Sequence, residues 1–167
     1  MAEMIDIYDE NKQKTGVQLP RSSRLEKGQY MLYVLALIED NEHRFLITQR
    51  SLNKKWAAGS WEIPGGGSHA GETSLDAVRR EVKEETGLDI SGCDAKVIYS
   101  YKNEDLARGD NYFVDIYRCS LDYTIDDVTM QKTEVIDTRL ASIEEITALN
   151  GKDGFLHYKR ICEALGI

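Results

Sequence analysis

The sequence has few of the features that hold a chain together without an apolar core, or that place it in a membrane. Its three cysteines are far apart, and no two stand at the spacing of a zinc site. The longest apolar run, residues 31–38, is far too short to cross a bilayer. A signal peptide has an apolar stretch after a basic start, and the first residues of this sequence lack such a stretch. We therefore expect a cytoplasmic protein with reduced thiols.

Positive charge is also scarce. Lysine and arginine number 21 against 29 aspartates and glutamates, which gives a formal net charge of −8. This balance excludes long nucleic acid and anionic membrane surfaces as partners, because both require clustered cations. A small anionic substrate remains compatible if a bound metal ion inverts the local charge. The 167 residues suit one domain, 1–167, with its own core.

Hydrophobic patterning predicts strands in the first two thirds and helices in the last, with one helix in mid-chain. We expect strands at residues 4–8, 30–38, 44–49, 96–102, 112–119 and 135–139, with 30–38 central and 44–49 its antiparallel partner. Residues 9–28 are rich in turn formers, so 1–29 forms an N-terminal strand and arm. Helices are expected at 74–86, at 142–149 with a stop at Gly151, and at 155–165. The order predicts an α+β fold with a mixed sheet flanked by helices.

The helix at 74–86 carries an unusual acidic face. Leu75, Val78 and Val82 fall within an arc of about 60°, which predicts a core stripe. Glu81, Glu84 and Glu85 share a neighbouring arc of about 100°. Like charges at i,i+4 destabilise a helix by roughly 0.2–0.5 kcal/mol per pair. A divalent cation such as Mg²⁺, which prefers carboxylate and carbonyl oxygens, would relieve this repulsion.

A solvated acidic face paired with Arg79 and Lys83 is the simpler explanation of these carboxylates. The loop before the helix favours a metal site instead. Three consecutive glycines, 65–67, let the backbone approach a ligand closely and leave carbonyl oxygens free as further ligands. Glu72 adds another carboxylate just before the helix.

Residues 66–88 resemble the Nudix box, G-x5-E-x7-R-E-U-x-E-E-x-G-U. The matching positions are Gly66, Glu72, Arg80, Glu81, Val82, Glu84, Glu85, Gly87 and Leu88, so every fixed position is filled. The approach to the box, residues 61–66, resembles the family's strand and turn. The resemblance implies a Nudix α/β/α sandwich. It also implies hydrolysis of a diphosphate in a small molecule, such as a nucleoside diphosphate derivative.

The resemblance also implies roles for the box residues. Glu84 and Glu85 would be the principal ligands of Mg²⁺ or Mn²⁺, and Glu81 would either bind metal or act as the general base. A carbonyl of Gly65 or Gly66 would complete the metal's coordination. Arg80 would pair with Glu72 and orient the helix, as a supporting salt bridge.

Residues outside the box are weaker candidates. Some family members use a later acidic residue as ligand or base, and Glu134 is the best candidate here. Glu104, Asp105 and Asp115 compete with it. Arg50 could reach a phosphate, and the aromatic candidates for stacking on a base are Trp56, Trp61, Tyr112 and Phe113, with core packing the alternative for each. His69 is expected to be exposed.

Residues 5–11 and 50–56 resemble a bacterial subgroup related to isopentenyl-diphosphate isomerase, which raises isomerisation as an alternative. The isomerases need a cysteine and histidine ligands near the box, whereas Gly65 and Gly67 stand at those loop positions. A sensor that has lost catalysis is a third reading, although the box is intact. The box recognises only the diphosphate and metal, so the leaving group stays open. A homodimer is also left open.

Overall fold

The computed structural model describes residues 2–167. Its strands are β1 (Met4–Tyr8), β2 (Lys14–Pro20), β3 (Met31–Glu39), β4 (Phe45–Arg50), β5 (Trp61–Glu62), β6 (Gly65–Gly67), β7 (Lys96–Asn103), β8 (Tyr112–Ser120) and β9 (Val135–Ala141). Its helices are α1 (Ser74–Thr86), α2 (Ile143–Asp153) and α3 (Tyr158–Leu165), with a 3₁₀ turn at Ile125–Asp127. All six expected strands and all three expected helices are present, within a few residues of the predicted ends.

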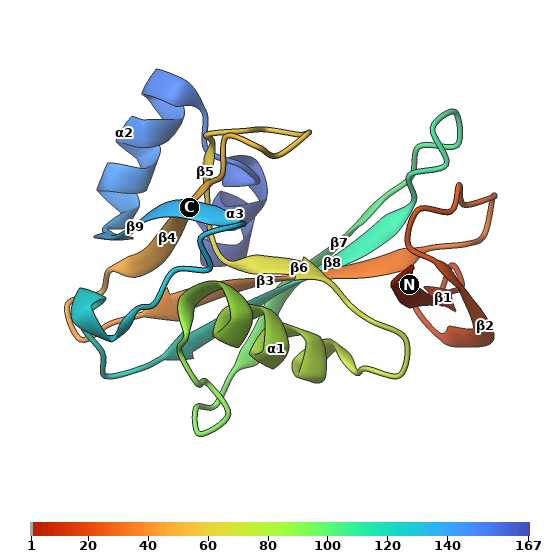
Figure 1. The fold of residues 1–167 in the computed structure, drawn as a ribbon, viewed down its shortest axis with the longest axis horizontal. Coiled ribbons are helices and arrows are strands. Elements are labelled where there is room, and N and C mark those ends of the chain that lie inside the picture. Colours follow the sequence, from red (N-terminus) through yellow and green to blue (C-terminus); the bar gives the residue numbers. More distant parts are fainter. Residues whose placement is uncertain (1) are drawn as a thin grey trace.

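The core lies on both faces of the strand β3, which is apolar along almost its whole length. Val34, Ala36 and Ile38 pack with α1, while Leu35 and Leu37 pack with residues of α2 and α3. Helix α1 therefore covers one face of the sheet and α2 and α3 the other (Figure 1). The predicted α/β/α sandwich with a mixed sheet is confirmed.

The neighbours of β3 differ from the expected ones. Strand β8 pairs with β3 in parallel along its length, and β6 pairs with it antiparallel at residues 33–35. Strand β4 meets β3 only at the pair Glu39 and Phe45, and then pairs with β5 and β9. The prediction that residues 44–49 form the antiparallel partner of the central strand is wrong beyond this one pair, because β6 occupies that edge of β3.

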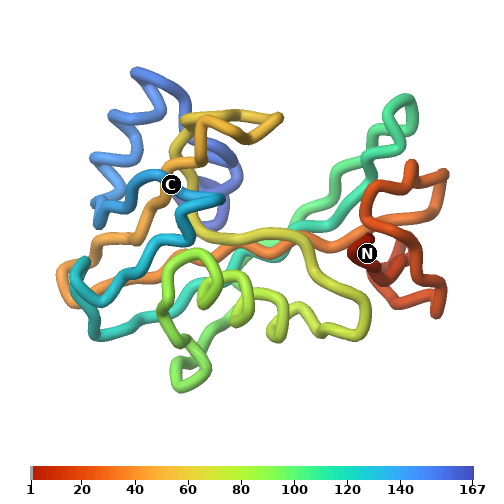
Figure 2. The backbone as a smooth tube through the Cα atoms, viewed as in Figure 1, coloured from red at the N-terminus to blue at the C-terminus, as the bar shows by residue number. Residues whose placement is uncertain are grey.

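The predicted arm at residues 9–28 is also wrong in part, because it contains β2. This strand forms an antiparallel hairpin with β1. Ile5 and Ile7 are buried against Leu25 and Met31, which attaches the hairpin to the start of β3. Figure 2 shows the hairpin at the opposite end of the molecule from α2.

The two C-terminal helices depart from the predicted ends. Helix α2 runs through Gly151 and ends before Gly154, whose N–H donates to the carbonyl of Asn150. The Asn150 side chain also accepts from the N–H of Phe155, at 3.0 Å. Phe155 lies outside α3, because its backbone forms a bridge with Trp61 and its ring is buried.

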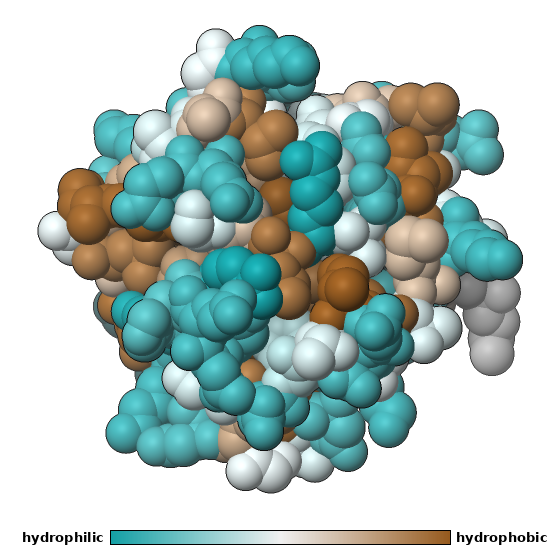
Figure 3. All heavy atoms as spheres, turned by 90° about the vertical axis from the view of Figure 1, so that its left-hand side faces the viewer, coloured by the Kyte–Doolittle hydropathy of each residue, from teal (hydrophilic) through white to brown (hydrophobic). Residues whose placement is uncertain are grey.

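The surface beside α2 is mostly hydrophilic, and its hydrophobic side chains lie in separate patches (Figure 3). Within residues 2–167, no helix is long and apolar enough to span a membrane.

Candidate active site

Helix α1 is fixed at both ends and along one side. Thr73 and Asp76 form a capping box, with hydrogen bonds of 3.0 and 3.1 Å, and Gly87 ends the helix in a left-handed conformation at φ 74°. Val78 and Val82 are fully buried against the sheet. Burial of this stripe sets the rotation of the helix and so turns the neighbouring glutamates towards β6.

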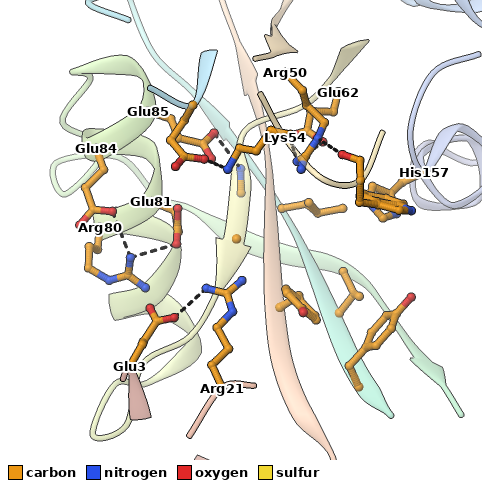
Figure 4. Close-up of a pocket in the computed structure, with 18 of the residues that line it drawn as sticks. Glu3, Arg21, Arg50, Lys54, Glu62, Arg80, Glu81, Glu84, Glu85 and His157 are labelled. Carbon is orange, nitrogen blue, oxygen red and sulfur yellow. Dashed lines mark hydrogen bonds and ion pairs between the residues drawn. The ribbon is translucent and has the colours of Figure 1, made fainter. Parts of the chain in front are cut away.

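These glutamates lie along a cleft of about 800 Å³ between α1, β6 and the loops above them (Figure 4). The candidate residues that line the cleft are Arg50, Trp56, Gly66, Arg80, Glu81, Glu84, Glu85, Tyr112 and Glu134. The topology thus brings together residues from six separate segments of the chain.

Glu81 and Glu85 are the more enclosed of the three helix glutamates. Glu81 is 9% exposed, and burial raises its pKa despite the opposing effect of Arg80. Burial raises the pKa of Glu85 well above its ordinary value, and the charges of Glu81 and Glu62 add to the effect. Among residues 2–167, no cationic side chain forms a salt bridge with Glu85. Its one hydrogen bond comes from the Gly65 N–H, at 3.4 Å.

The glycines beside these carboxylates have no room for side chains. A Cβ on Gly66 would come within 2.5 Å of the Glu81 carboxylate, and one on Gly65 within 2.1 Å of the Val34 carbonyl oxygen. The close approach of β6 to α1 therefore requires glycine at both positions. It also leaves no space at Gly65 for the cysteine that the isomerase alternative needs.

Arg80 joins the helix to the loop before it. Its guanidinium donates to both Glu72 carboxylate oxygens, at 2.8 and 2.9 Å, and to the Gly67 carbonyl, at 3.0 Å. It also contacts Glu81 at 2.9 Å and Glu84 at 3.2 Å. Burial opposes ionisation of Glu72, but the hydrogen bonds from Arg80 lower its pKa below the usual range. The expected contact between Arg80 and Glu72 is present, and Glu72 itself lies outside the cleft lining.

No three His, Cys, Asp or Glu side chains in residues 2–167 converge as a ready-made metal site. Nη1 of Arg80 bridges the carboxylates of Glu81 and Glu84. The donor set nevertheless fits a hard divalent cation. Glu85 is an enclosed carboxylate that forms no salt bridge among these residues, beside Glu81 and β6, and carboxylate and carbonyl oxygens are the ligands Mg²⁺ and Mn²⁺ prefer.

Of the four later acidic candidates, only Glu134 reaches the cleft, where Lys54 forms an ion pair with it. Glu104 instead accepts a hydrogen bond from Tyr30. Asp115 is 2% exposed and is bound by the hydroxyls of two serines. Asp105 accepts backbone hydrogen bonds in its own loop.

The aromatic candidates divide between cleft and core. Tyr112 and Trp56 line the cleft, and Trp56 is 60% exposed. Trp61 and Phe113 are buried and do not line it, so the prediction that they contact substrate is not supported. Phe113 packs on Tyr30 at 4.9 Å between ring centroids, and Trp61 packs in the core beneath α2 and α3.

Arg50 lies in the cleft and donates to Glu62, at 3.3 Å, and to the Trp56 carbonyl, at 3.1 Å. The Arg50 guanidinium also lies 5.3 Å from the centroid of the Trp56 ring, which is a cation–π arrangement. His69, expected to be exposed, is partly buried and forms an ion pair with Glu3 in the cleft wall.

Sequence reasoning missed several cleft residues. They include Glu3, Arg21, Tyr33, Lys54, Glu62 and His157. Lys54 and Glu62 lie in segments that resemble known sequences, 50–56 and 61–66, but neither side chain was assigned a role there. The other four belong to no motif and reach the cleft through tertiary packing. His157 has a left-handed backbone at φ 62°, and burial followed by the charge of Arg50 lowers its pKa.

Comparison with known proteins gives one consistent result. A family model described as the NUDIX domain matches residues 29–161. An uncharacterized Nudix hydrolase of Listeria monocytogenes is 33% identical over 156 residues, which cover 92% of this chain and 88% of that protein.

Two solved structures share the fold. A Deinococcus radiodurans protein has a TM-score of 0.76 at 19% identity, covering 97% of this chain and 99% of that one. The NUDIX domain of Shewanella oneidensis NrtR, complexed with ADP ribose, has a TM-score of 0.65 at 17% identity, covering 82% and 86%. The likeness to an isomerase-related subgroup is not confirmed by these comparisons. On the domain match and the Listeria relative, the chain belongs to the Nudix hydrolase family.

Proposed function

We propose that this Nudix hydrolase uses Mg²⁺ or Mn²⁺ to cleave the diphosphate linkage of a nucleoside diphosphate derivative or a related small molecule. The observation that carries the proposal is the enclosed Glu85 carboxylate, which lies beside Glu81 in the cleft and forms no salt bridge among residues 2–167. A polyanionic substrate enters such an acidic cleft only if a cation lies between the two sets of negative charges.

In this proposal Glu84 and Glu85 hold the metal, with Glu81 and a carbonyl of Gly65 or Gly66 as further ligands. A bound divalent cation neutralises the diphosphate oxygens and lowers the pKa of a coordinated water. In this proposal the proton of the attacking water goes to Glu134, or to Glu81 if Glu81 does not bind the metal.

Further residues of the cleft position helix α1 and the substrate phosphates. Arg80 holds Glu72 and the helix glutamates, and so fixes α1 relative to β6. Lys54 and Arg50 line the same cleft, and Figure 4 shows Lys54 extending towards Glu85; in this proposal both side chains supply positive charge for the substrate phosphates. Their present partners, Glu134 and Glu62, keep both side chains in place.

The size of the cleft supports a nucleotide-sized substrate. Its volume of about 800 Å³ lies within the range of small-molecule sites. Trp56 and Tyr112 offer aromatic surface for a base. The solved NrtR domain is complexed with ADP ribose, a molecule of this class.

The setting and assembly of the enzyme are part of the same proposal. All three cysteines are free thiols, which fits a reduced, cytoplasmic compartment. The homodimer left open by the sequence is tested by light scattering of the purified protein.

The proposal is tested by incubating the protein with a panel of nucleoside diphosphate derivatives and Mg²⁺ or Mn²⁺. We expect hydrolysis of at least one compound, and its loss in EDTA. Two matched variants are compared. Glu85→Gln removes one carboxylate charge from the cleft, and the control Glu144→Gln removes one from the exposed surface of α2. We expect kcat to fall by at least about 10²-fold in the first and to be unchanged in the second. Turnover in metal-free buffer, or no turnover on any compound, would contradict the proposal.

A further inference from the structure

The N-terminal hairpin lies outside the matched family domain, which begins at residue 29, yet it supplies two residues to the cleft. Arg21 directly follows β2, and Glu3 directly precedes β1. Figure 4 shows the Arg21 side chain extending towards β6 on the side where the helix glutamates lie. A part of this chain beyond the family domain thus contributes a cation to the active-site cleft.

Backbone contacts fix the hairpin to the fold. Tyr8 and Tyr30 exchange two backbone hydrogen bonds, of 2.8 and 3.0 Å. The loop before α1 donates to the hairpin twice, from Ala70 N–H to the Met4 carbonyl and from Gly71 N–H to the Asp6 carboxylate, each at 2.8 Å. Because these bonds join the hairpin to β3 and to the loop that carries Glu72, Arg21 is presented from a rigid support.

The Arg21 guanidinium also has a defined position. It lies 5.8 Å from the centroid of the Tyr33 ring, a cation–π arrangement. It packs against the backbone of Gly67, where an added Cβ would come within 3.1 Å of it. Gly67 directly follows Gly66, whose backbone packs on the Glu81 carboxylate. Arg21 and Glu81 thus line the same cleft, each beside a neighbouring residue of β6.

Arg21 has fewer partners than Arg50 and Arg80, two other cations of the cleft. Arg80 contacts three carboxylates and a carbonyl, and Arg50 contacts Glu62 and a carbonyl. Within residues 2–167, the one salt bridge of Arg21 joins Nη1 to the Glu3 carboxylate at 2.8 Å, and the Arg21 side chain is 40% exposed. The guanidinium also contacts Tyr33, and its remaining N–H groups are not paired with a carboxylate of these residues.

We propose that Arg21 binds a phosphate oxygen of the substrate diphosphate, which makes the N-terminal hairpin one wall of the substrate site. A guanidinium matches the geometry of phosphate and can donate two parallel hydrogen bonds to it. Glu3 holds Arg21 in place and competes with the substrate for it. The inference rests on the proposed function, because it assumes a diphosphate ligand in this cleft.

Binding of methylenediphosphonate, a diphosphate that cannot be hydrolysed, tests this inference. Isothermal titration with Mg²⁺ present is expected to show Kd about 10-fold or more higher in Arg21→Gln than in the parent chain. Arg21→Lys keeps the charge but loses the paired donors, so an intermediate Kd is expected. The control, Lys27→Gln, removes the same charge from an exposed position of the same arm and should leave Kd unchanged.

A second variant moves Kd in the opposite direction. Glu3→Gln weakens the competitor for Arg21, so methylenediphosphonate should bind about 2- to 5-fold more tightly. The Kd of Glu3→Gln tests the role of Arg21 even if Arg21→Gln fails to fold. Equal Kd values for Arg21→Gln, Lys27→Gln and the parent chain would overturn the proposal, as would an unchanged or raised Kd in Glu3→Gln.

The two proposals fail in different ways. Absence of hydrolysis by the parent chain refutes the proposed function, while the titration still decides the role of Arg21. Hydrolysis that persists with an unchanged KM in Arg21→Gln refutes only the role of Arg21.

Discussion

Glu85→Gln is expected to raise the stability of the metal-free protein, although it lowers kcat by at least about 10²-fold when Mg²⁺ is present. Glu85 is enclosed next to Glu81, and its N–H donor from Gly65 is long, at 3.4 Å. The uncharged amide keeps the shape of the side chain and removes the charge. Under the proposed function, this carboxylate serves metal binding although it lowers the stability of the metal-free fold.

The expected gain in the free energy of unfolding of Glu85→Gln has two contributions. Relief of the i,i+4 repulsion with Glu81 stabilises the helix by about 0.2–0.5 kcal/mol. Relief of the desolvation of a carboxylate with poor hydrogen bonding adds about 1–3 kcal/mol. For a chain of this length, a gain of about 1–3 kcal/mol raises Tm by roughly 2–12 °C.

The stability difference between Glu85→Gln and the parent chain depends on pH. Burial and the charges of Glu81 and Glu62 raise the folded-state pKa of Glu85 well above the unfolded value of 4.5. The contribution of Glu85 to the stability of the folded parent chain is therefore fully present below pH 4.5 and is lost as pH rises through the raised pKa. The advantage of Glu85→Gln should be absent at acidic pH and largest at pH 8.

Thermal unfolding by circular dichroism at pH 4 and pH 8 in EDTA measures this difference, with Glu144→Gln as the control. Added Mg²⁺ should then raise Tm of the parent chain and not of Glu85→Gln, because binding to the folded state alone stabilises it. A Glu85→Gln variant that melts below the parent chain at pH 8 in EDTA would refute the reasoning.

Three further changes probe the rest of the site. Arg80→Gln leaves Glu72 without its partner and should lower the free energy of unfolding by about 1–3 kcal/mol, measured by urea titration; an unchanged midpoint would contradict this. Gly66→Ala places a methyl group 2.5 Å from the Glu81 carboxylate, so kcat should fall at least about 10-fold with the fold intact by circular dichroism, and wild-type kcat would show that β6 can move aside. Incubation with isopentenyl and dimethylallyl diphosphate should show no interconversion by NMR, because Gly65 supplies no side chain to protonate an alkene; equilibration of the double bond would contradict the hydrolase assignment.

The sequence predicted helix α1 closely because its signals are local. The stripe of Leu75, Val78 and Val82 sets its buried face, and Thr73 and Gly87 set its ends. The mid-chain strands followed from apolar runs in the same way. Strand β2 was missed because most of its residues are exposed and it contains Gly16, so it lacks the alternation of a half-buried strand.

Other features depend on contacts between distant segments. The apolar run of β3 predicts burial on both faces, but it does not say which strands pair with it. The end of α2 depends on Asn150, which binds the backbone after Gly154, rather than on the earlier Gly151. An isolated aromatic residue in a sequence does not show whether it faces a cleft, as Trp61 and Tyr112 illustrate. Arg21 reaches the site through the hairpin, which no motif identifies.

Titration of the metal-free protein with Mn²⁺, followed by electron paramagnetic resonance of the free ion, tests most directly whether the helix carboxylates form a metal site. The account predicts saturable binding by the parent chain and by Glu144→Gln, and a loss of at least about 10-fold in affinity when Glu84 and Glu85 are both changed to glutamine. Equal affinity in all three proteins, or no binding by the parent chain with methylenediphosphonate present, would contradict it.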